Sequence, residues 1–200
     1  QGLRGIAIIS VLLFHLLPDL FINGYLGVDV FFVLSGYLIS SILSKHEKLS
    51  IDHFLDFYKR RFERIIPLYA TLLLMCLISS LFLFSSFDVE NTRISFVWSL
   101  ILARNLQQIH DSRDYWKQSS NSKPLLLHLW SLGVEMQYYL IAPFLSFALI
   151  FVKSRTHRVL ALIVLISISF ISYFSSDSTT QFNSPQCRAW QFLLGSMVAE

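Results

Sequence analysis

The sequence predicts an all-α fold: a polytopic transmembrane helical bundle with about six to seven membrane segments, one of which we expect to be re-entrant. Composition is the first indication, because 54% of the 200 residues are hydrophobic and only 14% are charged, whereas soluble domains carry roughly 25% charged residues. The mean hydropathy of +0.56 also indicates a membrane protein. In addition, several apolar runs approach or exceed the ~17 residues that a helix needs to cross a bilayer.

The first two apolar runs predict a helical hairpin. They cover residues 5–21 and 25–43, and the Asn23-Gly24 pair between them favours a tight turn. A polar segment, residues 44–64, follows, and we expect a short amphipathic helix within it. Its six basic residues are Lys45, Lys48, Lys59, Arg60, Arg61 and Arg64. By the positive-inside rule this segment and the N-terminus are cytoplasmic, and the Asn23-Gly24 turn faces outward.

The later part of the chain predicts further membrane segments. Residues 65–87 form a third span, whereas the apolar run 94–103 has only ten residues. Ten residues rise ~15 Å, half of the ~30 Å hydrocarbon core, which favours a re-entrant or interfacial helix. A polar loop, residues 107–123, comes next. Two further spans are predicted at residues 125–152 and 159–174. An outward loop at residues 175–184 follows them, and another span begins at residues 187–200.

A second basic cluster supports this order of segments. Lys153, Arg155 and Arg158 lie on the cytoplasmic side only if residues 94–103 do not cross the membrane. The chain begins at Gln1 and ends at Glu200 within an apolar run, so we expect residues 1–200 to be the N-terminal portion of one membrane domain, truncated at both ends. No basic stripe lies outside the membrane-flanking loops, which argues against nucleic-acid binding.

Two polar residues of the first apolar run are candidates for chemistry. Arg4 and His15 are eleven residues apart, which is ~1100° of helix, so they share a face and are separated by a rise of ~16 Å. This places Arg4 at the cytoplasmic interface and His15 deeper in the membrane. A neutral imidazole is a general base near neutral pH and can also accept an acyl group. A hydrogen-bonded core histidine is the structural alternative.

The second run contributes Asp29, Ser35 and Gly36. Asp29 lies near the start of its span, where it can orient His15, bind a hydroxyl-bearing substrate, or simply favour a helix N-terminus. Small residues such as Ser35 and Gly36 are typical of close helix packing.

Charged residues further along the chain are also candidates. Arg61 and Arg64, three residues apart, would present a fork of guanidinium groups suited to phosphates, including those of a CoA carrier; anchoring to anionic lipid is the alternative. Glu135 lies inside an apolar run and requires a partner, which a structural ion pair would also supply. Cys76 and Cys187 lack metal-ligand spacing, and we expect two free cysteines and no metal site.

Five motifs occur in one order along the chain. They are the Arg4-x10-His15 pair, GVDVFFVLSGYLI from Gly27, RRFERIIP at residues 60–67, HLWSLGVEMQYYLIAP at residues 128–143, and the final FNSPQCRAWQFLLGSMVAE. Together they resemble the acyltransferase-3 family from Gly2 to Glu200. The resemblance implies a polytopic membrane enzyme that moves acyl groups, usually acetyl, from cytoplasmic acyl-CoA to hydroxyls of surface or secreted glycans or lipids.

The resemblance also assigns roles to residues. His15 matches the family's essential histidine and Arg4 the arginine before it; Arg61 and Arg64 match an R-x-x-R pair associated with the acyl donor. Glu135 matches the acid of a W-S-L-x-x-E motif, whereas Met136 departs from a second glutamate often found there. The candidate site residues are His15, Glu135 and Asp29 for catalysis, Arg4, Arg61 and Arg64 for acyl-CoA (acetyl-CoA), and Ser35, Trp130 and Arg188 for the glycan or lipid acceptor.

Two other functions fit the same residues. A proton-coupled transporter or flippase would use His15, Asp29 and Glu135 as a relay within the membrane. A catalytically silent, receptor-like member of the family would keep the fold without transferring an acyl group.

Overall fold

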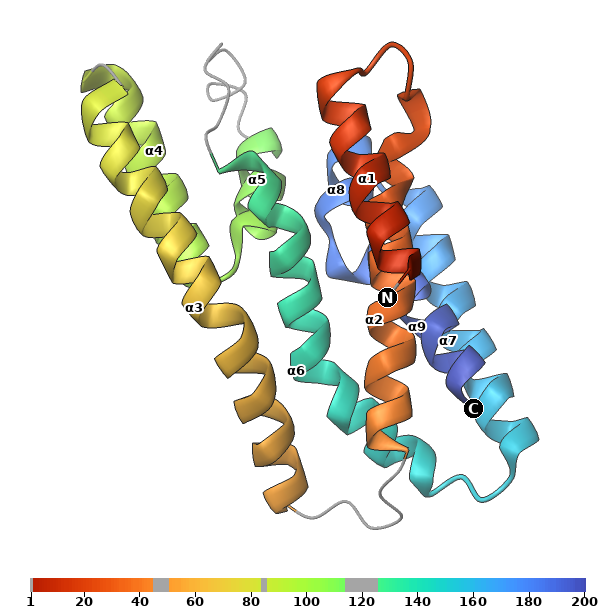
Figure 1. Cartoon of the computed structure of the whole chain (residues 1–200). Helices are drawn as coiled ribbons and strands as arrows, with labels where there is room; N and C mark the ends of the chain where they lie inside the picture. Colours follow the sequence, from red (N-terminus) through yellow and green to blue (C-terminus); the bar gives the residue numbers. More distant parts are fainter. Residues whose placement is uncertain (1, 45–50, 84–85, 114–125) are drawn as a thin grey trace. The chain divides into compact units, whose positions relative to one another are not determined.

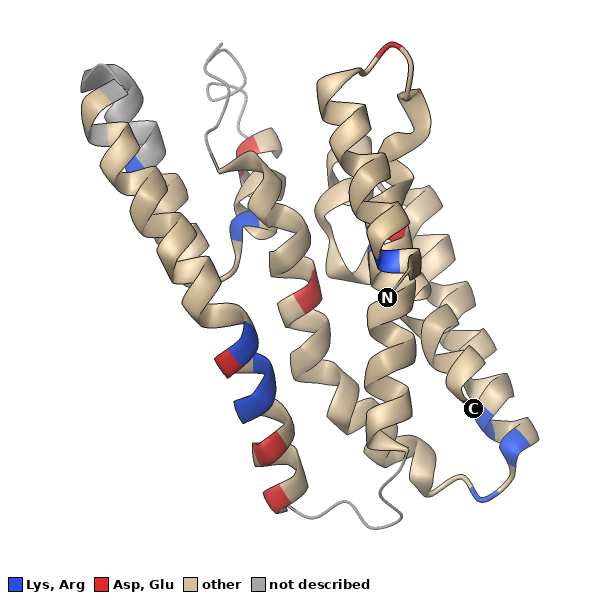
Figure 2. Cartoon of the chain, in the orientation of Figure 1, with Lys and Arg blue, Asp and Glu red and all other residues tan. Residues whose placement is uncertain are grey.

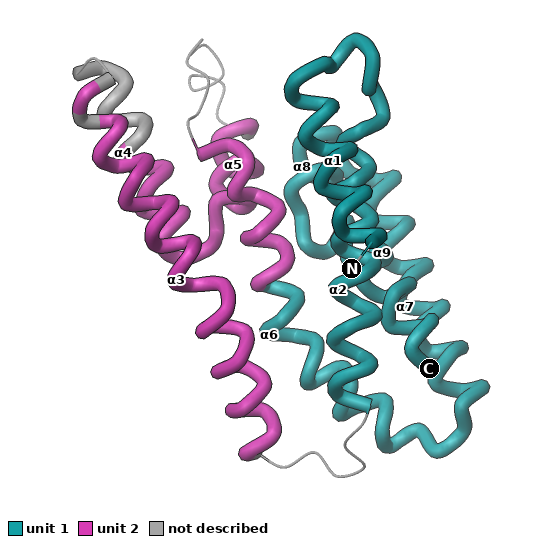
Figure 3. The backbone as a smooth tube through the Cα atoms, in the orientation of Figure 1, with its two compact units in different colours: residues 1–47, 137–200 teal, residues 48–136 magenta. Residues whose placement is uncertain are grey.

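The computed structural model describes residues 2–44, 51–83, 86–113 and 126–200, and its secondary structure there is helical. The chain divides into two compact units, shown in Figure 3: unit 1 comprises residues 1–47 and 137–200, and unit 2 comprises residues 48–136. The predicted all-α class is therefore confirmed. Each unit is described by itself.

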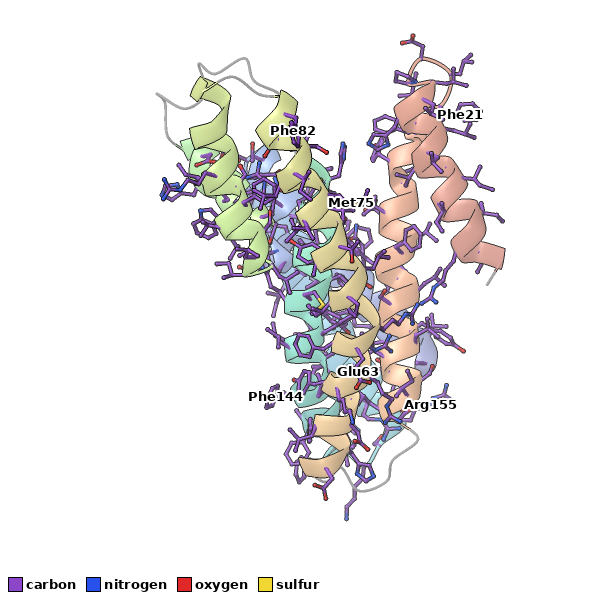
Figure 4. All side chains as sticks on the ribbon, turned by 60° about the vertical axis from the view of Figure 1, so that its left-hand side comes forward. Phe21, Glu63, Met75, Phe82, Phe144 and Arg155 are labelled. Atoms are coloured by element: carbon purple, nitrogen blue, oxygen red, sulfur yellow. The ribbon has the colours of Figure 1, made fainter. Side chains whose placement is uncertain are left out.

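Four helical segments within the described residues are long and apolar enough to cross a membrane. They are Ile22–Leu43, Asp52–Ser80, Leu127–Ile150 and Arg155–Ser175. They carry exposed apolar side chains: Met75 is 64% exposed and Phe144 is 65% exposed (Figure 4). Such exposure of large apolar side chains suits a lipid environment rather than water. The expected total of six to seven membrane segments stays a prediction.

Unit 1 begins with the predicted hairpin. Helix α1 is Gly2–Leu16, a 3-10 turn covers Ile22–Tyr25, and helix α2 is Leu26–Leu43. The helix α1 ends five residues before the predicted limit at Phe21. Pro18 accounts for this difference, because it has no N–H to continue the helical hydrogen bonds. Gly24 and Gly27 lie against the backbone of α1, at Ser10 and Ala7 respectively, so the two helices pack closely.

The rest of unit 1 comes from the end of the chain. Helix α6 is Trp130–Ile150, of which residues 137–150 belong to this unit, and α7 is Arg155–Ser175. A short helix α8, Ser178–Asn183, lies within the predicted loop 175–184 and is capped by Asp177, which accepts a hydrogen bond from the Thr180 N–H. Helix α9 is Pro185–Ala199.

Helices α2 and α9 pack most closely of all. A Cβ on Gly36 would clash with the carbonyl oxygen of Phe192, and a Cβ on Gly195 would clash with that of Val33. Phe192 is buried between two aromatic rings, with centroid distances of 4.6 Å to Phe32 and 4.2 Å to Tyr138. The prediction that Gly36 permits close helix packing is confirmed.

Unit 2 is dominated by one long helix. Helix α3 is Ile51–Leu83, so the predicted amphipathic helix and the predicted span that follows it form one continuous helix, with Pro67 inside it. Figure 2 shows that the charged residues of α3 gather in its first half. The two separate helices predicted here were wrong. They were divided where the polar segment 44–64 gives way to the apolar run 65–87, but a change in side-chain polarity does not interrupt helical hydrogen bonding, and α3 continues through it.

Two shorter helices follow α3 and reverse direction. Helix α4 is Ser86–Leu100 and helix α5 is Arg104–Arg113; Figure 1 shows α5 running back toward the end from which α4 came. Leu102, between them, has a positive φ of 56°. Neither helix has the length of a span. This reversal is the arrangement that a re-entrant segment requires, and the crossing itself stays a prediction.

The end of α4, where the pair reverses direction, packs against the middle of α3. The Tyr69 hydroxyl donates to the Ser99 carbonyl at 2.7 Å, and Tyr69 lies within the candidate span Asp52–Ser80. Tyr69, Leu73, Phe96 and Leu126 form a buried apolar cluster in this unit. The predicted loop 107–123 was partly wrong, since residues 107–113 belong to α5; residues 114–123 lie outside the described residues.

Candidate functional site

Helix α1 holds Arg4 and His15 on one continuous helix, as the spacing predicts. The rise between them is ~16 Å. The His15 Nδ1 lies 2.7 Å from the Val11 carbonyl oxygen. Because a carbonyl only accepts hydrogen bonds, Nδ1 carries the proton, and Nε2 is then the basic nitrogen of the neutral imidazole. This tautomer leaves Nε2 as the atom able to take a proton or attack an acyl group.

The register of the hairpin separates Asp29 from His15. Gly24 lies against Ser10 and Phe14, whereas Gly27 lies against Ala7 and Val11. Continuing this antiparallel register, Asp29 is level with about residue 7 of α1 and therefore ~12 Å along the helix axis from His15. Asp29 is much nearer to the level of Arg4. The register does not support the prediction that Asp29 orients His15 by direct contact.

The carboxylate of Asp29 instead pairs with Arg188. The Arg188 Nη1 lies 2.9 Å from Asp29 Oδ1, and Nε donates to the Phe182 carbonyl at 3.2 Å. The guanidinium also lies 5.1 Å from the centroid of the Phe182 ring. The wholly buried Gln191 is a neighbour of the carboxylate. Two residues predicted for separate roles, catalysis and acceptor binding, therefore form one ion pair.

The other candidates are distributed between the two units. Ser35 is buried on α2 in unit 1. Trp130 and Glu135 lie on the first turns of α6, in unit 2. Arg61 and Arg64 lie on α3, also in unit 2; the Arg61 guanidinium carbon is 5.5 Å from the Phe57 ring centroid, and Arg64 is exposed. The structure thus brings Asp29 to Arg188 within unit 1, and keeps the arginine pair on one helix of unit 2.

Two further groups were missed by the sequence reasoning. Arg104, at the start of α5, is only 3% exposed. In unit 1, Arg158 pairs with Glu200 at 2.6 Å and lines a cavity of about 260 Å³ with four serine residues, Ser40, Ser44, Ser146 and Ser196. The position of Arg104 beside a half-length apolar run was a usable signal, because a charge there needs a reason. Nothing in the local sequence pairs residues 158 and 200.

The described residues contain no group of three or more His, Cys, Asp or Glu side chains placed to hold a metal ion. Cys76 and Cys187 are free cysteines, as expected.

Comparison with known proteins agrees with the motifs. The family model for the acyltransferase domain, Acyl_transf_3, matches residues 1–200. O-acetyltransferase OatA of Staphylococcus aureus is 33% identical over 206 residues, which cover 100% of this chain and 34% of that protein. Peptidoglycan O-acetyltransferase OatA of Listeria monocytogenes is also 33% identical, over 100% of this chain and 33% of that protein. No solved structure shows significant similarity to the chain.

The chain thus spans about a third of the length of the curated relatives that it matches. The family model covers the entire stretch in which the five motifs lie. The chain belongs to the acyltransferase-3 family.

Proposed function

We propose that this chain is part of a membrane-embedded O-acetyltransferase that moves an acetyl group from acyl-CoA to a hydroxyl of peptidoglycan. The observation that carries the proposal is the match of the entire chain to an acyltransferase family and to relatives named as O-acetyltransferases, one of them for peptidoglycan. Several apolar helices support a membrane location. The comparisons give no support to a transporter or flippase.

His15 is the proposed reacting residue. With its Nδ1 proton donated to Val11, Nε2 can remove the proton of the acceptor hydroxyl while that oxygen attacks the thioester carbonyl carbon. The carbon–sulfur bond then breaks, and the imidazolium returns the proton to the CoA thiolate. In the other route, Nε2 itself attacks the thioester carbonyl carbon and CoA leaves as the thiolate; the acyl-imidazolium then passes its acyl group to the hydroxyl, whose proton goes to the thiolate. Both routes use the same nitrogen.

The arginines are proposed to bind the donor. Arg61 and Arg64 lie at the charged end of α3, where guanidinium groups would contact CoA phosphates. Arg4 lies on the same helix as His15, ~16 Å before it, which is comparable to the length of an extended pantetheine arm. Asp29 with Arg188, Ser35, Trp130 and Glu135 are the proposed residues for the acceptor and for charge stabilisation.

The test uses membranes in which the complete protein is expressed, supplied with acetyl-CoA labelled in the acetyl group. We expect label in the peptidoglycan fraction with the wild type, and a loss of at least ~100-fold with His15→Gln, because general-base catalysis contributes roughly that factor or more. His157→Gln is the matched control, since His157 is an exposed histidine on α7.

The outcomes separate the alternatives. Equal labelling by wild type and His15→Gln would remove His15 from the mechanism. Label in a lipid fraction alone would replace peptidoglycan as the acceptor. An absence of transfer by the folded wild-type protein, with a phenotype that still depends on His15, would favour a receptor-like member. Acid-quenched samples that retain label on the protein would indicate the acyl-imidazole route.

A further inference from the structure

Among the described residues of unit 2, Arg104 is the least exposed charged residue, and the proposed reaction does not use it. It is 3% exposed and occupies the first position of α5, directly after the reversal at Leu102. The Tyr69–Ser99 hydrogen bond holds the end of α4 against the middle of α3. Arg104 therefore lies inside the protein at the level of an apolar span, where a guanidinium is costly without a counter-charge.

The guanidinium of Arg104 has incomplete hydrogen bonding. Within the part of the chain that the structure describes, neither Nε nor Nη1 has a hydrogen-bond partner. Asp111 acts on Arg104 electrostatically, yet its carboxylate accepts a hydrogen bond from Gln107 Nε2 at 3.1 Å, and it lies two helical turns further along α5. Buried N–H groups are almost always satisfied in folded proteins. Two buried donors on one cation, with no acceptor among the described residues, point to an acceptor that a ligand supplies.

The backbone around Arg104 favours the same kind of acceptor. Arg104 opens a helix of ten residues, whose first N–H groups carry the positive end of the helix dipole. The helix α6 also approaches closely here, because Gly133 has no Cβ to clash with Leu102 and Asn105. The fully buried Asn105 adds a polar side chain at this point. A half-helix that begins inside a membrane domain is a known way to bind an anionic group.

We propose that the start of α5 is a binding site for a small oxyanion, a carboxylate or a phosphate group, held by Arg104. The shared chemistry is a compact negative charge with oxygen acceptors, and its source is either a soluble ligand or the headgroup of an anionic lipid. This site is independent of the acyl-transfer proposal and stands or falls separately from it.

Thermal unfolding of the complete protein in nanodiscs of phosphatidylcholine tests the site. Sodium phosphate or sodium acetate is titrated against sodium chloride at constant ionic strength. For the wild type we expect Tm to rise by roughly 3 °C or more at ten times Kd, because a ligand that binds only the folded state stabilises it. Replacing part of the phosphatidylcholine by phosphatidylglycerol, without added phosphate, tests the lipid source.

Two variants identify the residue. Arg104→Met keeps the side-chain length but removes the charge, so without anion its Tm should equal or exceed that of the wild type, and its response to anions should vanish. Arg93→Met is the matched control, because Arg93 is an exposed arginine of α4, and it should respond like the wild type. Arg104→Lys retains the charge and should keep part of the response if Arg104→Met does not fold.

A wild-type Tm that is indifferent to phosphate, acetate and phosphatidylglycerol would overturn the proposal, as would an equal response in Arg104→Met. A response to phosphatidylglycerol alone supports the site and assigns it to a lipid headgroup. A response to phosphate or acetate supports it and assigns it to a soluble ligand.

Discussion

The Asp29–Arg188 ion pair joins residues that are 159 positions apart in the sequence. It ties the first turn of α2 to the first turn of α9, and the side chains are 24% and 8% exposed. Removing one partner would leave the other charge uncompensated in a setting that water reaches poorly, which destabilises by about 3–5 kcal/mol for a fully buried pair. The partial exposure of Asp29 reduces this, and we expect about 2–3 kcal/mol for Asp29→Asn.

The measurement is the Tm of the detergent-solubilised protein for the two single variants Asp29→Asn and Arg188→Gln and for the double variant. We expect each single change to lower Tm, and the double change to cost less than the sum of the two, because the pair is coupled. Additive losses would show that the two residues act separately. If Asp29→Asn abolished acyl transfer while leaving Tm unchanged, Asp29 would have a chemical role rather than a structural one.

At the scale of the element, two glycines set the distance between α2 and α9. A Cβ at Gly36 would clash with Phe192, and a Cβ at Gly195 would clash with Val33, in both cases at a backbone carbonyl that cannot move away alone. We expect Gly36→Ala and Gly195→Ala each to destabilise by about 1–3 kcal/mol, the usual cost of overpacking. The measurement is again thermal unfolding in detergent.

Gly5→Ala is the matched control for these variants. Gly5 lies on α1, and a Cβ there would meet no atom within 4 Å, so this change should leave the stability unchanged or raise it slightly, since alanine favours a helix. Equal behaviour of Gly5→Ala and Gly36→Ala would contradict the close packing of α2 and α9.

The elements that the sequence predicted well are those whose apolar run ends at a clear local signal. The predicted span 25–43 became α2, Leu26–Leu43, and the predicted span 159–174 lies within α7, Arg155–Ser175. Prediction failed where local signals compete with the rest of the fold. The end of a charged, polar segment suggested a boundary near residue 64, but α3 continues through it.

The contacts of the candidate site were less predictable than its residues. Helical spacing is a local property, so the placement of Arg4 and His15 on one helix followed from the sequence. The ion-pair partner of Asp29 could not be predicted from the sequence. The choice between His15 and Arg188 depends on the register of the hairpin and on a helix at the far end of the chain. Arg104 was visible only as a charge at the limit of a short apolar run, and its burial is a property of the folded structure.

At the scale of the whole molecule, the arrangement of the chain across the membrane depends on the α4–α5 pair. If α5 returns to the side from which α4 started, the basic first half of α3 and the basic residues 153, 155 and 158 lie on the same side of the membrane. If residues 86–113 cross instead, the two basic groups lie on opposite sides, against the positive-inside rule. The reversal of direction between α4 and α5 (Figure 1) favours the first arrangement.

Single cysteines test this arrangement in intact cells. In a background of Cys76→Ala and Cys187→Ala, we place cysteines at three exposed positions, Asn23→Cys, Ser154→Cys and Ser178→Cys. With a cytoplasmic N-terminus and a re-entrant α4–α5 pair, a membrane-impermeant maleimide should label residues 23 and 178 in intact cells and residue 154 only after permeabilisation. Labelling of residue 154 in intact cells, with residue 23 also labelled, would instead require an additional crossing between α3 and α6, and Arg104 would then lie on a spanning segment rather than at the tip of a reversal.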